Sequence, residues 1–250
     1  MTASTTPVQP RAPEQDTRFD RRFSEILDYA AEVFAEKGYE GASMRDLSRL
    51  SGMSLAGLYY YFDSKEKLLY HIQKHTFTTI VNRLRERLAA SSDPEERIRI
   101  FVHNHVDYAI ANQRAMKVLA HEDDVLQDEH GAELAAIKRE YYQICVGLME
   151  GLAKSARPRR LEQNTAAAGV STRTCVLALF GIMNWLYTWY KPGVDPSAEV
   201  IAQQMSDIFL QGAGGRRGPG ARPPQVGSAP VDGSPEAKPN KRARKRSRIL

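Results

Sequence analysis

Cysteine is scarce in this sequence, since only Cys145 and Cys175 occur among 250 residues. The two lie far apart in apolar, helix-like surroundings, so we expect buried free thiols in a reducing compartment and not a disulfide or a redox switch. No apolar run approaches the ~20 residues that a membrane-spanning helix needs. Residues 1–16 also lack an apolar stretch behind a basic start, so no secretory signal is expected. The sequence therefore predicts a cytoplasmic protein that makes no contact with membranes.

Signatures of catalysis are missing as well. The sequence contains no phosphate-binding glycine loop, nucleophile elbow or HExxH pattern. Metal-ligating residue types occur in His103-x-His105 and in residues 121–124 (His-Glu-Asp-Asp), but neither has paired ligands at i, i+4 spacing on an obvious single face. We therefore predict that the protein is not an enzyme, holds no metal and requires no cofactor.

A net positive charge is absent from most of the chain, although the whole sequence carries +5. Residues 212–250 hold ten basic residues against two acidic ones, a net charge of +8, which leaves −3 for residues 1–211. The basic composition therefore says nothing about whether the main part binds nucleic acid. The tail is rich in Gly, Pro and Ser and poor in large apolar residues, so we expect residues 212–250, like residues 1–17, to be disordered.

Between these two segments, strand signals are nearly absent and apolar residues recur at the 3.6-residue helical period. Start signals mark several helices, such as Asp93-Pro94 followed by two acidic residues. The predicted helices cover about residues 20–37, 43–51, 55–61, 64–88, a helix that begins at 93, 128–153, 171–190 and a last helix from 195. The sequence thus predicts an all-α fold with about nine or ten helices.

Residues 43–65 contain the pattern of a helix-turn-helix. Ser43 is a predicted N-cap, with Asp46 in the position of a capping-box acid. Gly52 permits a tight turn, and Ser54 caps a second short helix. Two short helices joined in this way can place the second helix in the major groove of DNA.

Three stretches of this region resemble the TetR family of bacterial regulators. They are Ala30-Ala31-x-Val33-Phe34-x-x-x-Gly38-Tyr39, Ser43-Met44-Arg45-Asp46-Leu47 and Tyr59-Tyr60-Tyr61-Phe62-x-Ser64-Lys65-Glu66-x-Leu68. The last stretch is highly specific, whereas a bare helix-turn-helix would be a weak signal. The resemblance implies a DNA-binding domain over residues 18–66, a helical ligand-binding and dimerisation domain over residues 67–211, and a homodimer.

The resemblance and the residue types together indicate the contacts with double-stranded DNA. Ser43 and Arg45 are expected to bind phosphates, as is Lys65 at the N-terminus of a later helix. Tyrosine hydroxyls can donate to phosphates, and their rings can lie against sugars or thymine methyls. The predicted DNA-binding residues are Ser43, Arg45, Ser54, Leu55, Ala56, Gly57, Tyr59, Tyr60, Tyr61 and Lys65.

Three of these residues depart from many relatives. Leu55 and Ala56 stand where polar or basic residues often lie, and Tyr61 often corresponds to histidine. Base readout is therefore expected to use apolar contacts to thymine methyls and DNA shape. The alternative is that the aromatic run is core, which we expect for Leu58 and Phe62. Three consecutive tyrosines cannot all be buried by one helix face.

The second distinctive segment is residues 180–193. It resembles the penultimate helix of TetR-type regulators of fatty-acid, aromatic-acid and sterol catabolism, many of which respond to acyl-CoA thioesters. In that group the last two helices of each subunit form a four-helix dimer interface, although an ordinary core helix is the alternative. The predicted interface residues are Leu177, Phe180, Met183, Asn184, Tyr187, Met205 and Ile208.

A ligand cavity is expected among the helices between residues 103 and 189. Its candidate lining residues are Phe101, His105, Tyr108, Met116, Leu119, Tyr141, Tyr142, Ile144, Cys145, Met149 and Trp185. The alternative for most of them is plain core. An acyl-CoA also needs cations for its phosphates, for which Lys138 and Arg139 are candidates, unless they form a solvated helix face.

Two functions from different classes follow. The first is a homodimeric repressor that a small apolar-acid effector, such as an acyl-CoA, releases from its operator. The second is an architectural DNA-binding protein that ignores ligands and uses its basic tail. That tail, Lys241 to Arg248, would be an import signal in a eukaryote, but here it is interpreted as a cationic arm that raises non-specific DNA affinity, or as a segment without function. Footprinting separates the two, because only the repressor protects a discrete palindrome.

Overall fold

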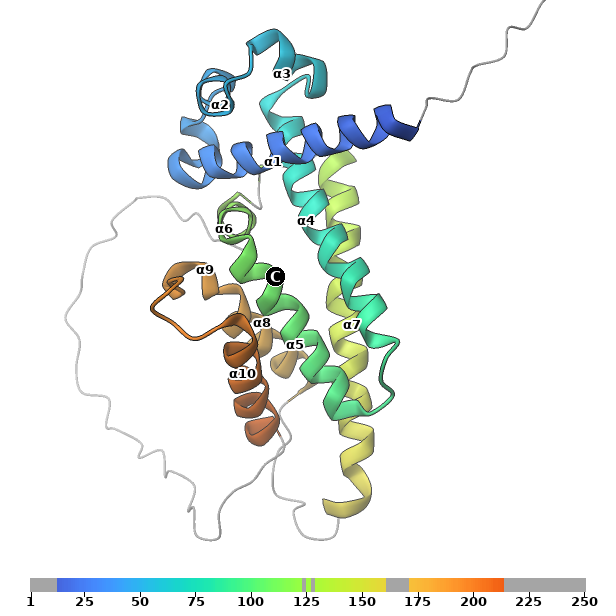
Figure 1. The fold of residues 1–250 in the computed structure, drawn as a ribbon. Coiled ribbons are helices and arrows are strands. Elements are labelled where there is room, and N and C mark those ends of the chain that lie inside the picture. The colour runs from blue at the N-terminus through green and yellow to red at the C-terminus, as the bar shows by residue number, and fades with distance from the viewer. Residues whose placement is uncertain (1–12, 123–124, 127–128, 161–170, 214–250) are drawn as a thin grey trace, which may run out of the picture.

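The computed structural model describes residues 13–122, 125–126, 129–160 and 171–213 (Figure 1). All secondary structure in these ranges is helical, which confirms the predicted all-α fold. The helices are α1 (Pro13–Gly41), α2 (Met44–Ser51), α3 (Leu55–Tyr61), α4 (Lys65–Leu88), α5 (Pro94–Ala111), α6 (Gln113–His121), α7 (Glu129–Arg160), α8 (Thr172–Asn184), α9 (Leu186–Trp189) and α10 (Ala198–Ala213). None of the described helices is long and apolar enough to cross a membrane.

Two hydrophobic clusters divide the molecule into a head and a body. The head cluster joins α1, α2, α3 and the first turns of α4, packs against Val118 of α6 and Leu134 of α7, and includes Ile26, Leu47, Leu58 and Phe62. The body cluster joins the rest of α4 with α5, α7, α8 and α10. Figure 1 shows α2 and α3 above α1, with α6 and the body below it. Residues of α4 belong to both clusters. The predicted domain boundary at residue 66 lies within the first turn of this continuous helix.

Helix boundaries follow local chemistry where caps are present. Ser64 Oγ accepts a hydrogen bond from the backbone of Lys67, and Asp93 accepts one from Glu96 ahead of Pro94, so the predicted starts of α4 and α5 are confirmed. Gly52 ends α2 with φ 68°, a left-handed conformation that glycine adopts without strain. The predicted turn between α2 and α3 is therefore confirmed.

Several helix boundaries differ from the prediction. The helix expected over residues 171–190 is interrupted at Trp185, whose carbonyl accepts bonds from both the backbone and the hydroxyl of Thr188. The apolar pattern continues through this break, so periodicity alone could not find it. Likewise α10 begins at Ala198 and not at 195. α1 begins already at Pro13, while residues 1–12 and 214–250, most of the predicted arm and tail, lie outside the described residues.

Candidate functional site

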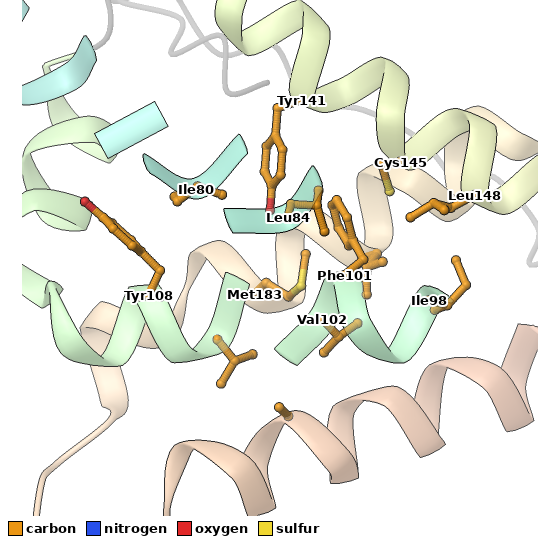
Figure 2. Packing of buried hydrophobic residues seen from close by; sticks show 14 of the residues in the cluster. Ile80, Leu84, Ile98, Phe101, Val102, Tyr108, Tyr141, Cys145, Leu148 and Met183 are labelled. Carbon is orange, nitrogen blue, oxygen red and sulfur yellow. The ribbon is translucent and has the colours of Figure 1, made fainter. Parts of the chain in front are cut away.

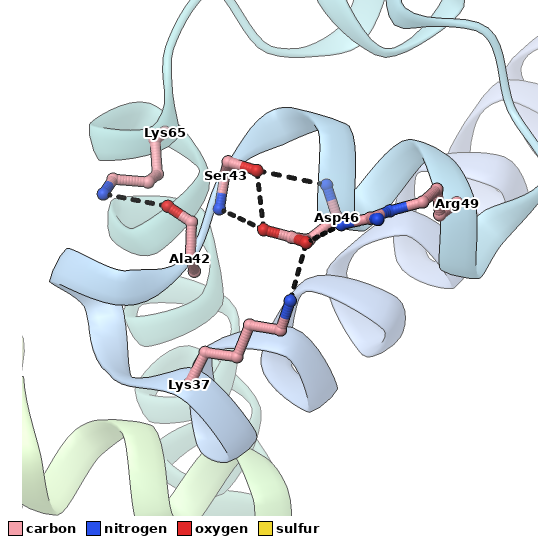
Figure 3. A network of polar contacts seen from close by, with 6 residues as sticks. All are labelled: Lys37, Ala42, Ser43, Asp46, Arg49 and Lys65. Atoms are coloured by element: carbon pink, nitrogen blue, oxygen red, sulfur yellow. Dashed lines mark hydrogen bonds and ion pairs between the residues drawn. The ribbon is translucent and has the colours of Figure 1, made fainter.

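The helix-turn-helix is held in place by a polar network around Asp46 (Figure 3). The Ser43 hydroxyl accepts the backbone N–H of Asp46 at 3.2 Å, and the Ser43 N–H donates to the Asp46 carboxylate at 3.0 Å. Lys37 of α1 donates to the same carboxylate at 2.6 Å, and Arg49 of α2 pairs with it as well. The hydrogen bond from Lys37, followed by that from Ser43, holds the pKa of the Asp46 carboxyl well below its usual range. The predicted capping box is confirmed, and it ties α2 to α1.

Ser43→Ala is expected to lower the free energy of unfolding by about 1 kcal/mol, a typical cost of removing a helix N-cap. The physical reason is that the backbone N–H of Asp46 loses its acceptor and the Asp46 carboxylate loses the Ser43 hydroxyl. Chemical denaturation of the full chain measures the change. Ser155→Ala on α7 is the control, because its exposed hydroxyl bonds only to a carbonyl within its own helix. Equal stability of the two variants would contradict the cap's role.

The recognition helix α3 presents part of its surface to solvent. Leu58 and Phe62 are 0% and 1% exposed, so they belong to the core as expected. Tyr59 and Tyr60 are 49% and 69% exposed, whereas Tyr61 is half-buried and stacks on Phe19 of α1. The three tyrosines therefore differ in accessibility, and Tyr59 and Tyr60 are the freer two.

The remaining predicted DNA-binding residues lie at the ends of α2 and α3. Arg45, Ser54 and Ala56 are exposed, and Leu55 is half-buried. Ser54 caps α3 by accepting the N–H of Gly57 at 3.0 Å. A methyl group on Gly57 would lie 3.2 Å from the Ser54 hydroxyl, so this glycine leaves room for the cap. Tyr59 and Tyr60 follow Ala56 by three and four residues, so these three side chains share one side of α3.

Lys65 makes hydrogen bonds within the protein that the sequence did not predict. Its ammonium donates to the carbonyls of Tyr39 at 2.7 Å and Ala42 at 3.2 Å, and lies 4.1 Å from the centroid of the Tyr39 ring. These contacts join the start of α4 to the end of α1. No local pattern pointed to them, because the partners lie 26 and 23 residues earlier. A phosphate contact by Lys65 stays a prediction.

Most predicted ligand-binding residues lie together inside the body. Phe101, Tyr141 and Cys145 meet there from α5 and α7, against Met183 of α8, which was predicted for the dimer interface (Figure 2). The other buried candidates are His105, Tyr108, Met116 and Met149, whereas Leu119, Tyr142 and Ile144 are half-buried. Trp185 is 56% exposed and lies apart from this cluster. The buried candidates therefore share one neighbourhood at the centre of the body.

His105 is the chemically unusual member of this neighbourhood. Its Nδ1 lies 3.0 Å from the hydroxyl of Tyr141, but its Nε2 has no hydrogen-bond partner among the described residues. The side chain is 2% exposed, and burial lowers the pKa of its imidazole to about 4. Burial also raises the pKa of Tyr141 well above its usual value, and that of Cys145 to about 12. All three groups are therefore neutral near pH 7, with one polar ring nitrogen left unsatisfied.

Two surface hollows lie outside this cluster. One of about 930 Å³ lies between the end of α4, the start of α5 and α7, and is lined by Arg85, Leu88, Pro94, Arg97, Ile144, Leu148 and six other residues. Of the predicted ligand-binding residues, only Ile144 lines this hollow. The sequence feature that could have located this hollow is the pair Gly147 and Gly151, one helical turn apart on α7. Because glycines have no side chain, they leave space on this face of the helix. A second hollow, of about 370 Å³, lies between α1 and α6.

The predicted dimer residues divide between surface and core. Ile208 is 68% exposed, and Leu177, Phe180, Asn184, Tyr187 and Met205 are half-buried. Met183 is fully buried within its own subunit. Four more apolar side chains in this region are exposed but were not predicted for the dimer interface. They are Ile182 on α8, Trp185 directly after it, Trp189 on α9 and Val200 on α10. The last helices thus expose more apolar surface than the predicted set contained.

The short helix α6 connects the body to the head. Glu122, at its C-terminal end, accepts the backbone N–H of Tyr39 at 2.9 Å. Arg114 pairs with Glu32 of α1 at 2.9 Å. On the body side, the Tyr187 hydroxyl lies 3.1 Å from Nε2 of His121. α6 thus contacts α1 and also follows α5, the helix that holds His105, with Asn112 between them.

No group of three or more metal-ligating side chains occurs among the residues that the structure describes. Asp123 and Asp124, which belong to the histidine-containing stretch considered above, lie outside them. His105 and His103 follow one another on α5, but His105 has Tyr141 as its neighbour and no acidic partner within the described ranges.

Comparisons with known proteins agree with this architecture. Residues 26–72 match the model of the bacterial regulatory proteins of the tetR family, and residues 91–213 match the Tetracyclin repressor-like C-terminal domain. The HTH-type transcriptional repressor KstR2 of Rhodococcus jostii is 25% identical over 206 residues, which cover 81% of this chain and 96% of that protein.

Solved structures share the fold. The TetR-family regulator PfmR from Thermus thermophilus has a TM-score of 0.64 at 27% identity, covering 74% of this chain and 96% of its own. AibR, solved in complex with isovaleryl coenzyme A and operator DNA, has a TM-score of 0.64 at 24% identity, covering 75% of this chain and 97% of its own. The chain therefore belongs to the TetR family of DNA-binding transcriptional regulators, which are not enzymes and have operator DNA as their partner.

Proposed function

We propose that this protein is a homodimeric repressor that an acyl-CoA or a similar apolar acid releases from its operator. Residues 18–66 would bind DNA, residues 67–211 would bind the effector and the second subunit, and the basic tail would strengthen non-specific contacts with DNA. Such a regulator would act in the cytoplasm, where the operator lies. The observation that carries effector release is the buried His105, with its unsatisfied ring nitrogen, on the helix that leads into α6.

The DNA-binding surface is supported by the exposure of Tyr59 and Tyr60 on a helix capped at its start. Arg45 is exposed at the start of α2. Tyrosine hydroxyls and an arginine suit phosphates, while Ala56 and Leu55 offer methyl groups to thymine. These residues would combine contacts to the DNA phosphates, which position the protein, with apolar contacts to the bases.

Dimerisation is supported by the apolar surface on the last helices. Ile208 and Val200 on α10, and Ile182 on α8, are 68%, 43% and 41% exposed in the isolated subunit. Soluble proteins rarely leave such side chains clustered in water unless a partner covers them. A two-fold interface built from these helices would place two reading heads against the two halves of a palindromic operator.

The effector class is supported by the chemistry of the body. Aromatic rings surround His105, since Phe180 and Tyr141 have ring centroids 6.3 and 6.1 Å from its imidazole. A buried nitrogen without a partner favours a ligand that supplies one hydrogen-bonding group inside an apolar site. A thioester carbonyl attached to an apolar chain has this combination. AibR, bound to isovaleryl coenzyme A and operator DNA, indicates that the fold has room for both.

Effector release is tested with a duplex that the wild-type full chain selects from a random-sequence library. Adding the cognate acyl-CoA at physiological salt is expected to weaken binding between about 5- and 150-fold, the usual range of allosteric coupling. Coenzyme A alone and the matching free acids are the controls. Tyr141→Phe keeps the ring but removes the hydroxyl beside His105, so it should reduce the response and leave effector-free DNA binding intact.

Two outcomes would contradict the proposal. Unchanged DNA binding across a panel of chain lengths and sterol-type thioesters would exclude an acyl-CoA effector. Uniform footprinting protection, with no discrete palindrome, would favour the ligand-independent architectural protein.

A further inference from the structure

The DNA-binding head has few cations available for phosphates. Residues 18–66 contain seven basic residues against nine acidic ones. Lys37 and Arg49 pair with Asp46, and Lys65 is bound to backbone carbonyls. The remaining basic residues are Arg45 on α2 and three arginines near the start of α1, namely Arg18, Arg21 and Arg22. Most of the uncommitted positive charge of the head therefore lies on α1.

The start of α1 is fixed against the recognition helix. Phe19 stacks on Tyr61 with ring centroids 4.9 Å apart and meets Tyr60 edge-on at 6.5 Å. One turn later Phe23 packs on Phe62 at 4.8 Å. Both phenylalanines are half-buried. Aromatic pairs at these distances are stabilising, so this turn of α1 and α3 form one rigid surface that includes the exposed ring of Tyr60.

Helical geometry separates the three arginines. At 100° per residue, Arg18 and Arg22 share one flank of Phe19, whereas Arg21 points about 160° away from it. Arg22 is close enough to Tyr61 of the recognition helix for the two to interact electrostatically. Arg22 lies about 60° and Arg18 about 100° around the helix from Phe19, the residue that stacks on the recognition helix. Of the three arginines, Arg21 therefore points furthest from the recognition helix.

Both flanking arginines are accessible to a phosphate. Arg18 and Arg22 are exposed, and within the described part of the chain Arg18 has no acidic partner. Arg22 pairs with Glu25 at 2.7 Å, but both side chains are more than 40% exposed. Exposed pairs of this kind contribute little to stability. Arg22 can thus exchange its carboxylate for a phosphate at small cost.

We propose that Arg18 and Arg22 form a second DNA-binding site, which contacts backbone phosphates next to the segment that α3 reads. Guanidinium groups bind phosphate oxygens in a bidentate geometry. The stacking of Phe19 on Tyr61 keeps this site at a fixed distance from Tyr60. The contact is with the backbone, so it positions α3 without selecting the sequence. The site rests on the family's DNA-binding function and does not depend on the effector.

The salt dependence of DNA binding tests this site. Each full-length variant is measured with the library-selected duplex between 50 and 200 mM salt. Each phosphate contact contributes about 0.9 to the slope of log K against log salt, which is a roughly three- to four-fold change over this range. Arg18→Ala and Arg22→Ala should therefore each lose about that much of the salt dependence per bound subunit, and also bind more weakly at 50 mM.

Arg21→Ala is the matched control, because it removes the same charge from the same helix at the position that points furthest from Phe19 and the recognition helix. Its slope should equal that of the wild type, apart from the small general effect of one charge. Arg22→Lys should restore most of the slope, because a point charge still binds phosphate. Equal slopes for the Arg18, Arg21 and Arg22 variants would overturn the proposal. A wild-type chain that selects no duplex would instead contradict DNA binding as a whole, so the two failures are distinguishable.

Discussion

Ile208→Arg is expected to give a monomer that no longer binds its operator tightly. Ile208 is 68% exposed in the subunit and lies on α10, whose core-facing residues Ala202 and Ser206 are fully buried. In a two-fold interface the substitution would bury two arginines without partners. An uncompensated buried charge costs about 3–5 kcal/mol, so the dimer dissociation constant should rise by more than about 100-fold. Analytical ultracentrifugation across a concentration series measures it.

Gln203→Arg is the control for this experiment. Gln203 is also exposed on α10 but lies on the other flank, where it donates to Asp207 at 3.0 Å. This variant should remain dimeric and bind DNA as the wild type does. A dimeric Ile208→Arg protein would show that α10 does not form the interface. A monomeric variant with unchanged operator affinity would contradict the need for two linked heads.

His105→Gln is expected to make the protein less sensitive to acid. Burial lowers the pKa of His105 to about 4 from an unfolded value near 6.5. Below pH 6.5 the unfolded chain therefore binds a proton that the folded chain does not. The stability contributed by the neutral ring is complete above pH 6.5 and is lost as the pH falls toward 4. Between pH 7 and pH 5 this group alone should cost about 2 kcal/mol.

The measurement is the difference in unfolding free energy between pH 7 and pH 5, for the wild type and the variant. Glutamine does not titrate, so the variant should lose about 2 kcal/mol less over this interval, whatever its stability at pH 7. Ala111→Gln, at an exposed position of the same helix, is the control and should keep the wild-type dependence because neither side chain titrates. Burial also lowers the pKa of His71, but this contribution is common to all three proteins. An unchanged pH dependence in His105→Gln would mean that the buried ring does not control acid stability.

The head could be predicted largely from the sequence because its signals are local. Caps such as Ser43, Ser54 and Ser64 act within three residues, and Gly52 allows a turn that few other residues adopt without strain. Leu58 and Phe62 were recognisable as core because they are four residues apart, about one helical turn, and one helix face cannot also bury the three tyrosines between them. In each case the interacting groups are close in sequence, so the sequence pattern alone is enough to predict how they are arranged.

The body could be predicted less well, because its features depend on contacts between distant segments. The break at Trp185 lies within an unbroken apolar pattern, and the burial of Met183 depends on which face of α8 meets its own subunit. The sequence by itself determined an all-helical chain with a helix-turn-helix, since hydrophobic period and capping are local. Only the tertiary structure decided that Lys65 binds the end of α1, that His105 has no second partner within the described ranges and that Phe19 docks on Tyr61. The physical reason is that these contacts join side chains on different helices, whose relative positions are set by the packing of the whole core.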